Sequence, residues 1–238
     1  NGSNMKKSFF NIDSAIMRRH DTAMKKIEEP FKKIEEITQY NQEKVLAAFI
    51  SNGVSESHFV ETTGYGYGDR GRDTLDKVFA QSLGAEDALV RHSFASGTHT
   101  ISVALFGLLR PGDTMMCVTG APYDTLHPII GLQGDGQGSL KDFGVEYKQV
   151  DLNNEGRPDL PKIEEAIKNA KIDLVYIQRS RGYSLRPSLS VEEIGEIIKI
   201  ARKYSKAPVM VDNCYGEFVQ AQEPTDFGAD IIVGSLIK

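Results

Sequence analysis

The sequence has few cysteines, no long apolar run and no excess of basic residues. Its 238 residues include two cysteines, Cys117 and Cys214, and both lie in apolar segments. This excludes a disulfide framework and predicts buried, reduced thiols in a cytoplasmic protein. No apolar stretch reaches the roughly 20 residues that a membrane-spanning helix needs. The formal net charge is -5, so no basic field favours nucleic acid or an anionic membrane as a partner.

The N-terminal part of the sequence has the pattern of an amphipathic helix. The segment "KKIEEPF" is followed directly by "KKIEEIT", which places Ile27 and Phe31 near one face. We expect Pro30 to kink or split the helix that residues 21–52 predict. The pattern predicts a helical arm over residues 1–60, which either serves oligomerisation or packs on its own domain.

From residue 87 onward, strand-like segments alternate with helix-like segments. The expected strands cover 87–93, 113–118, 145–150, 172–178, 207–212 and 230–235, and the expected helices cover 97–110, 158–171 and 190–205, with another at 73–83. Asp73 can cap the helix at 73–83, and Ser190 with Glu193 forms a capping-box pattern. Strands joined by helices predict an α/β fold with a mainly parallel sheet, in which ligands bind at the carboxyl ends of the strands.

A turn of small residues, "SFASGTHT", separates an expected strand from an expected helix. In it, Ser96, Gly97 and Thr98 precede the helix. Helix N-terminal amides favour an anion, and glycine lets that anion approach the backbone, so the turn suits a phosphate. It matches neither G-x-x-x-x-G-K-[ST] nor G-x-G-x-x-G, so no nucleotide motif is supported. Taken alone, it also fits an ordinary capped helix start.

Other candidate residues follow expected strands. Asp212 ends the strand in "VMVDNCYGEF", Tyr123 lies in the loop "TGAPYDTL", and Ser235 and Lys238 follow the last strand in "GADIIVGSLIK". A carboxylate at the end of a buried strand is costly without a cationic partner. Each residue also has an ordinary interpretation: Asp212 as a turn cap, Tyr123 as a packing residue and Lys238 as a solvated side chain.

The succession of these features on one sheet indicates pyridoxal 5'-phosphate as cofactor. A helix N-terminus suits the phosphate, an aromatic side chain stacks on the ring, a carboxylate holds the ring nitrogen protonated, and a lysine forms a Schiff base. The turn at 96–98, then Tyr123, Asp212 and Lys238, supply these groups in order. No metal site is predicted.

The sequence resembles the fold-type-I pyridoxal-phosphate enzymes of the cysteine and methionine metabolism group. It is most similar to the cystathionine β-lyase or "aluminium resistance" branch, and the segments that carry this are "VDNCYGEF", "GSLIK", "ASGTHT" and "YGYGDRGRDTL". The resemblance covers about residues 20–238. It implies a three-layer α/β sandwich as the large, cofactor-binding domain over residues 61–238. Family members continue into a small C-terminal domain, so we expect this chain to be the first part of a longer protein.

The resemblance also implies roles for individual residues. Lys238 matches the Schiff-base lysine, Asp212 the partner of the pyridine nitrogen and Tyr123 the ring-stacking tyrosine. Matches to phosphate-binding positions are Ser96, Gly97, Thr98 and Ser235, together with Tyr67 and either Arg70 or Arg72, which in the group reach the neighbouring subunit. Tyr65 competes with Tyr67 for its role. A homodimer or homotetramer with shared active sites is therefore expected.

One segment departs from the family pattern. After the strand at 172–178, the lyases carry an acidic turn rich in Ser, Asn and Pro, whereas this sequence has "RSRGYSLRP". Arg179, Arg181 and Arg186 add positive charge where substrate or cofactor edges would lie, although arginine clusters are also common on plain surfaces. The arginine that holds the substrate carboxylate in the group falls beyond this chain.

The resemblance implies a carbon–sulfur lyase that acts on a small sulfur amino acid, in the manner of cystathionine β-lyase or methionine γ-lyase. The freed lysine, Lys238, would remove the Cα proton of the substrate. Two alternatives remain open. The same cofactor could serve transamination, γ-replacement or decarboxylation, or the chain could be a non-catalytic stress or metal-tolerance protein on the same fold.

Overall fold

Five parallel strands form the centre of the computed structural model, which describes residues 10–62, 65, 67–134 and 137–237. The strands are β1 (Thr114–Cys117), β2 (Glu146–Gln149), β3 (Leu174–Gln178), β4 (Val209–Asp212) and β5 (Ile231–Val233). Their order across the sheet is β2-β1-β3-β4-β5, and every neighbouring pair is parallel. The predicted α/β fold with a parallel sheet is confirmed.

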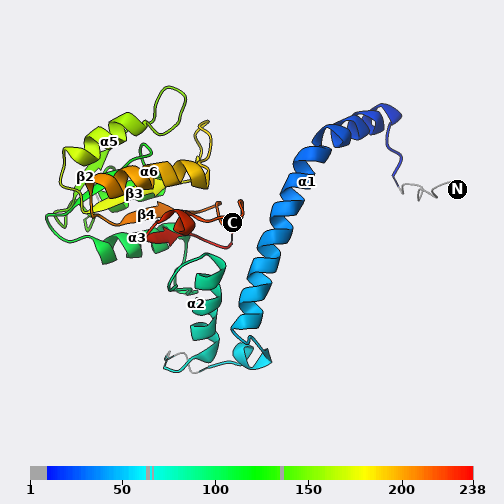
Figure 1. Cartoon of the computed structure of the whole chain (residues 1–238), viewed down its shortest axis with the longest axis horizontal. Coiled ribbons are helices and arrows are strands. Elements are labelled where there is room, and N and C mark those ends of the chain that lie inside the picture. Colours follow the sequence, from blue (N-terminus) through cyan, green and yellow to red (C-terminus); the bar gives the residue numbers. More distant parts are fainter. Residues whose placement is uncertain (1–9, 63–64, 66, 135–136, 238) are drawn as a thin grey trace.

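Helices cover both faces of this sheet (Figure 1). The helices of the sheet domain are α3 (Gly97–Leu108), α4 (His127–Ile130), α5 (Leu160–Lys168) and α6 (Val191–Tyr204), and the short 3-10 helices are η1 (Glu56–Phe59), η2 (Asp124–Leu126) and η3 (Pro224–Phe227). One buried cluster joins α5 and α6 to one face, and a second joins α3 and α4 to the other. The layers are therefore helix, sheet and helix.

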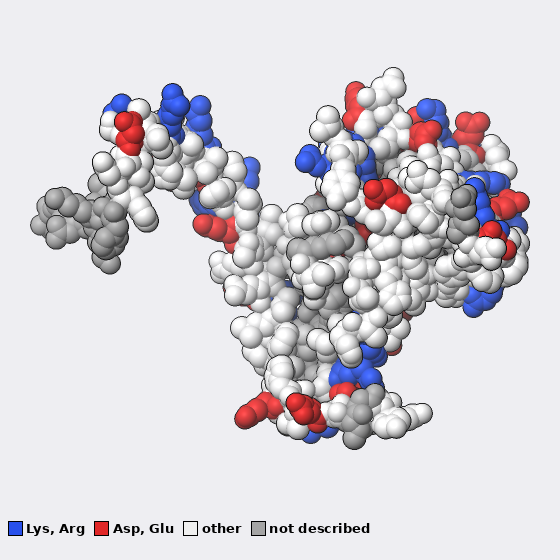
Figure 2. Space-filling model, turned by 180° about the vertical axis from the view of Figure 1, so that it is seen from behind, with Lys and Arg blue, Asp and Glu red and all other residues white. Residues whose placement is uncertain are grey.

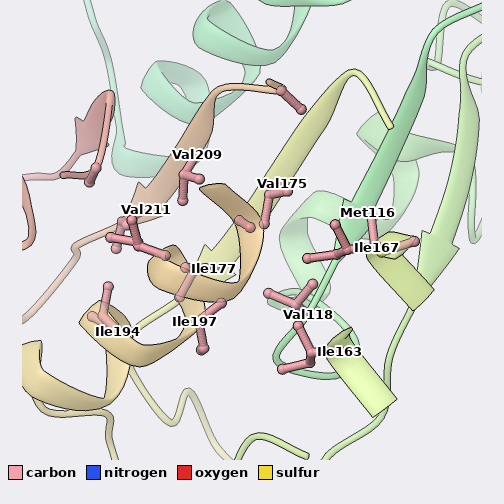
Figure 3. Packing of buried hydrophobic residues seen from close by; sticks show 14 of the residues in the cluster. Met116, Val118, Ile163, Ile167, Val175, Ile177, Ile194, Ile197, Val209 and Val211 are labelled. Atoms are coloured by element: carbon pink, nitrogen blue, oxygen red, sulfur yellow. The ribbon is translucent and has the colours of Figure 1, made fainter. Parts of the chain in front are cut away.

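Alternating side chains of the strands divide between the two faces. In β3, Val175 and Ile177 point toward α5 and α6, whereas Leu174 and Tyr176 belong to the α3 side. Figure 3 shows Val175 and Ile177 in the same buried cluster as Ile194 and Ile197 of α6. Burying each such aliphatic side chain contributes about 1.5–3 kcal/mol. Burial on both faces explains why β3 and β4 read as nearly continuous apolar runs.

One of the two predicted helix caps is confirmed by the structure. Ser190 and Glu193 form the predicted capping box at α6, and Asp159 caps α5. The helix expected at 73–83 is instead α2 (Arg70–Ser82), so the prediction of Asp73 as its cap is wrong. Asp69 caps it, because its carboxylate accepts a hydrogen bond from the Arg72 N–H at 3.0 Å. Backbone hydrogen bonding at this cap holds the pKa of Asp69 below its usual value.

The strand expected at 87–93 is absent from the described sheet, which corrects that prediction. The backbone N–H of Val90 donates to a carboxylate oxygen of Asp76 at 2.8 Å. Arg91 pairs with the same oxygen at 2.7 Å. The segment therefore bonds to a side chain of α2 rather than to a neighbouring strand.

The N-terminal arm is a single helix, α1 (Ser14–Ser51), which runs through Pro30 without being split. Figure 1 shows it bending toward its N-terminal end, and Figure 2 shows that end standing away from the body. Its C-terminal half is attached through Asn41, whose amide donates at 2.9 Å to the carbonyls of Phe218 and Gln220. The division at residue 60 and a role in oligomerisation stay predictions.

Among the described residues, no helix combines the length and apolar character that crossing a bilayer requires.

Candidate active site

A pocket of about 400 Å³ lies at the carboxyl ends of β1, β3 and β4. Its described lining residues come from the start of α3, the loop after β1, the loop after β3 and the end of β4. They are Thr98, Ile101, Tyr123, Thr125, Leu126, Ser180, Arg181, Gly182, Tyr183, Ser188, Asp212, Cys214 and Tyr215. The pocket thus brings together Thr98, Tyr123 and Asp212, which the sequence singled out separately.

Asp212 lies at the floor of the pocket and is only 3% exposed. One carboxylate oxygen accepts a hydrogen bond from the Tyr176 hydroxyl at 3.4 Å, and the other accepts from the backbone N–H of Cys214 at 3.1 Å. Burial raises the pKa of Tyr176, so its hydroxyl stays protonated and remains a donor. These contacts hold the carboxylate in place, ready to accept a hydrogen bond from a cationic N–H in the pocket.

Tyr123 is held by contacts from the β3 side. Its backbone N–H donates to the side-chain oxygen of Gln178 at 2.6 Å. Its ring lies 5.6 Å from the ring of Tyr183, at an angle of 41°. Gly182 has a φ of +58°, and a Cβ there would lie 3.2 Å from the Tyr123 ring, so the turn packs closely on it.

The acidity of Tyr123 is reduced by the same neighbours. Hydrogen bonding with Tyr183, followed by burial and the nearby negative charge of Asp124, raises the pKa of Tyr123 to about 12. At neutral pH the side chain is therefore a neutral phenol. An aromatic face and a protonated hydroxyl are both available in the pocket wall.

The predicted phosphate turn begins α3, a 12-residue helix, beside the pocket. Ser96 is its N-cap, and the Ser96 side chain accepts a hydrogen bond from the His99 N–H at 3.1 Å. Gly97 is buried at the first helical position, and the hydroxyls of Thr98 and Thr125 lie 2.7 Å apart. Because N–H groups of a first helical turn lack partners within the helix, this end suits an anion.

The described end of the chain is attached beside Asp212. Val233 ends β5 opposite Asp212, and after it the Ser235 N–H donates to a carboxylate oxygen of Glu217 at 3.0 Å. Burial raises the pKa of Glu217. Ser235 is not among the described residues that line the pocket. Lys238 lies outside the described residues.

The residues predicted to act across a subunit interface do not reach this pocket within the described chain. Tyr67, 94% exposed, lies just before α2, and Arg70 and Arg72 lie in its first turn. Figure 1 shows that α2 begins at its end farther from the sheet. Tyr65 is likewise exposed. A contribution to a neighbouring subunit stays a prediction.

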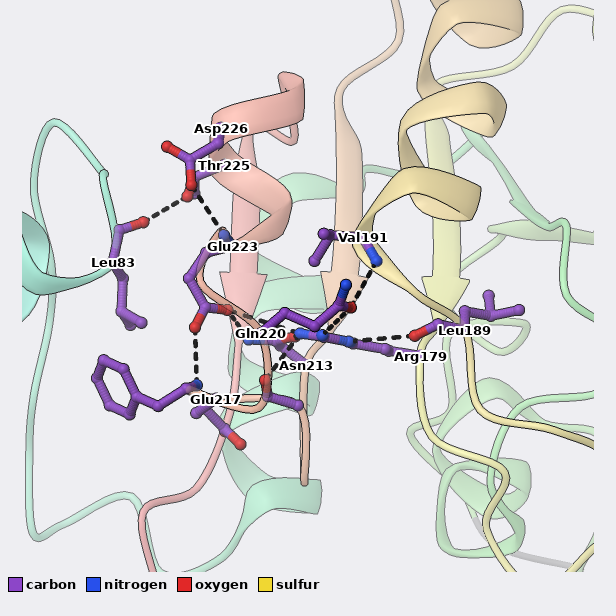
Figure 4. A network of polar contacts seen from close by, with 12 residues as sticks. Leu83, Arg179, Leu189, Val191, Asn213, Glu217, Gln220, Glu223, Thr225 and Asp226 are labelled. Carbon is purple, nitrogen blue, oxygen red and sulfur yellow. Dashed lines mark hydrogen bonds and ion pairs between the residues drawn. The ribbon is translucent and has the colours of Figure 1, made fainter. Parts of the chain in front are cut away.

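The three arginines of "RSRGYSLRP" have different surroundings. Arg179 is buried and donates to the Asn213 side chain and the Gly216 carbonyl, each at 2.8 Å (Figure 4). Arg186 donates to the Gln178 carbonyl at 3.2 Å. Both hold backbone segments in place, whereas Arg181 lines the pocket.

Sequence reasoning did not identify Tyr176, Thr125 or Tyr183. Tyr176 could have been found from the strand period, since residues two apart share a face and the register pairs Gln178 with Asp212. The contact of Tyr183 with Tyr123 depends on the path of two loops, for which the sequence carries no comparable periodic signal.

Comparison with known proteins places these features in a wider context. The methionine gamma-lyase family model matches residues 16–238. The Bacillus subtilis protein YnbB, described as uncharacterized, is 49% identical over 209 residues, covering 87% of this chain and 49% of that protein. The L-methionine gamma-lyase of Pseudomonas putida is 30% identical over 181 residues, covering 75% of this chain and 40% of that enzyme.

A solved structure agrees with the fold. It is that of a carbon-sulfur lyase involved in aluminum resistance from Clostridium novyi NT, with 49% sequence identity and a TM-score of 0.90. The match covers 95% of this chain and 54% of that one. The chain thus spans about half the length of these relatives.

Proposed function

The chain belongs to the methionine gamma-lyase family, and we propose that it is the cofactor-binding part of a pyridoxal 5'-phosphate-dependent carbon–sulfur lyase. The substrate would be a small sulfur-containing amino acid. The observation that carries this proposal is the pocket in which a buried carboxylate, Asp212, lies with Tyr123 and the N-terminal turn of α3. These groups match the ring nitrogen, the ring face and the phosphate of the cofactor.

The donor set of the pocket fits this cofactor. The start of α3 offers backbone amides and the Thr98 hydroxyl to a phosphate dianion. Two neutral donors, the Tyr176 hydroxyl and the Cys214 N–H, orient the Asp212 carboxylate, and its negative charge would favour a protonated ring nitrogen. Lys238 would hold the cofactor aldehyde. The bound cofactor would supply an electron sink for the charge that develops on the substrate Cα.

The residues of this chain would divide the remaining work. Lys238 Nζ would take the proton from the substrate Cα, because it is the one base that the cofactor linkage itself brings there. Tyr123 would hold the ring face and, as a neutral phenol, keep its hydroxyl proton near the leaving sulfur. Tyr176 would keep the Asp212 carboxylate in one orientation.

The test uses the full-length protein. We expect visible absorbance from bound cofactor, and release of a 2-oxo acid from cystathionine, cysteine or methionine without an amino acceptor. Lys238→Ala should abolish both, and Asp212→Asn should lower the turnover number at least about a hundredfold. Lys206→Ala, at an exposed lysine, is the matched control. Cofactor-free protein would refute the cofactor assignment, and a requirement for an amino acceptor would favour transamination.

We further propose that the active protein is a homodimer or homotetramer with shared sites. Arg70 is exposed, and Arg72 is partly buried near it, both away from the pocket of their own chain. Mixing inactive Lys238→Ala protein with an inactive Arg70→Ala or Arg72→Ala variant should restore part of the activity. No recovery after subunit exchange would contradict a shared site.

We assign the protein to the cytoplasm. Cys117 and Cys214 are both buried and form no disulfide in the described structure. Burial raises the pKa of Cys117 to about 12, which keeps it a thiol. Detection of the full-length protein in a secreted or membrane fraction of its own cells would refute the assignment.

A further inference from the structure

Two charged residues occur among the described residues that line the pocket, and they lie at different depths. Asp212 is buried at the floor, where the proposed cofactor needs it. Arg181 is exposed at the rim, on the turn that follows β3. The rest of the described lining is apolar, aromatic or hydroxyl-bearing. The rim of the pocket therefore carries positive charge that no other lining residue neutralises.

The Arg181 guanidinium has no hydrogen bond or ion pair with any described residue, which sets it apart from its two neighbours in sequence. Arg179 contacts side-chain and backbone oxygens in the protein interior, and Arg186 bonds to backbone carbonyls. Both are desolvated, and burial lowers the pKa of each. Of the three arginines, Arg181 is the one whose donors remain available to a ligand.

The turn that carries Arg181 is held in place. The Arg181 carbonyl accepts from the Ser184 hydroxyl at 2.7 Å and from the Ser184 N–H at 3.2 Å. The next residue, Gly182, packs against the Tyr123 ring, and Tyr183 lies beside that ring. The guanidinium therefore projects from a turn with a defined path next to the proposed ring-stacking residue.

We propose that Arg181 determines specificity by binding a second carboxylate of the substrate, at the end distant from the reacting carbon. This rests on the proposed function. The ring nitrogen of the proposed cofactor would meet Asp212 at the buried floor, whereas Arg181 lies at the exposed rim. A guanidinium recognises a carboxylate through paired hydrogen bonds. The preferred substrate class is then a dicarboxylic thioether amino acid, such as cystathionine, over a thioether with an uncharged tail.

Two probes of similar length separate these classes. S-(2-carboxyethyl)-cysteine carries the second carboxylate, and S-propyl-cysteine lacks it. In both, β-elimination removes the Cα proton, breaks the Cβ–S bond and, with one water molecule, yields pyruvate, ammonia and the corresponding thiol. Pyruvate release by the full-length holoenzyme therefore gives kcat/KM for each probe by the same assay.

Arg181→Gln should lower the ratio of kcat/KM for the carboxylate probe to that for the propyl probe by roughly ten- to a hundredfold. The loss should fall mainly on KM, since a distant contact is equally strong in ground and transition states. Arg181→Lys should restore part of the ratio. Lys206 lies just before β4, at the amino ends of the strands and thus opposite the pocket. Lys206→Gln removes the same charge and should leave the ratio unchanged.

The outcomes distinguish three errors. If the wild-type holoenzyme releases pyruvate but Arg181→Gln lowers both probes equally, the inference is wrong. If Arg181→Gln instead weakens binding of the cofactor, measured by visible absorbance, the arginine binds the cofactor and the inference is again wrong. If the wild type retains its cofactor but releases pyruvate from neither probe, β-elimination itself is refuted.

Discussion

Replacing Arg179 by methionine should destabilise the protein strongly, although the residue lies outside the pocket. Arg179 is 3% exposed, and its guanidinium contacts three oxygen acceptors in the segment that follows β4, the third being Gln220 at 3.0 Å. It also lies 3.6 Å from the carboxylate of Glu223, which is 1% exposed. Removing the cation leaves the buried Glu223 carboxylate without its cationic partner, which costs about 3–5 kcal/mol.

The assay is urea unfolding of the full-length protein, followed by circular dichroism. Arg19→Met, at an exposed arginine of α1, is the control and should change the free energy of unfolding by less than about 0.5 kcal/mol. Adding Glu223→Gln to Arg179→Met should cost less than the sum of the two single changes, by about 1–3 kcal/mol. A loss below about 1 kcal/mol for Arg179→Met alone would refute the reasoning.

Two further predictions concern the pocket and the chain segment beside it. Tyr183→Phe should move the phenolate titration of Tyr123 from about 12 toward its ordinary value near 10, as measured by ultraviolet difference titration; an unmoved midpoint contradicts this. Because folding raises the pKa of Tyr123, the neutral phenol contributes fully to the free energy of unfolding below about pH 10. This contribution is lost as the pH rises through about 12. Gly234→Ala would place a Cβ 2.0 Å from a Glu217 carboxylate oxygen. This clash should displace the segment that leads to Lys238, so titrations with the cofactor should show weaker binding. Gly107→Ala, where a Cβ meets nothing within 4 Å, should bind normally; equal affinities would contradict the prediction.

The three central strands, β1, β3 and β4, could be predicted because they are buried on both faces. β3 and β4 are short apolar runs, and α6, the helix between them, carries a clear capping signal. The apolar centre of the segment at 87–93 predicts a strand, but the segment does not join the described sheet. Whether a short segment pairs with a strand depends on tertiary contacts. The cap of α2 was misplaced because Asp69 and Asp73 are equally good caps by residue type.

The site could be predicted in part for the same reason. Asp212 ends a buried strand and Tyr123 follows another, so the parallel topology brings both to the carboxyl ends of the strands. The arginines at 179, 181 and 186 look alike in the sequence. Their surroundings differ because the end of β3 directs Arg179 into the interior, whereas the turn at Gly182 places Arg181 at the pocket.

The buried position of Arg179 has a consequence for the order in which the chain can fold. Its acceptors at Asn213, Gly216 and Gln220 all follow it in the sequence. While the chain is being synthesised from its N-terminus, the end of β3 emerges before any of these oxygens. Until they emerge, this cation must remain hydrated, because burying it alone would be costly. The end of β3, and with it the wall of the pocket, therefore becomes fixed only after the segment beyond β4 has been made.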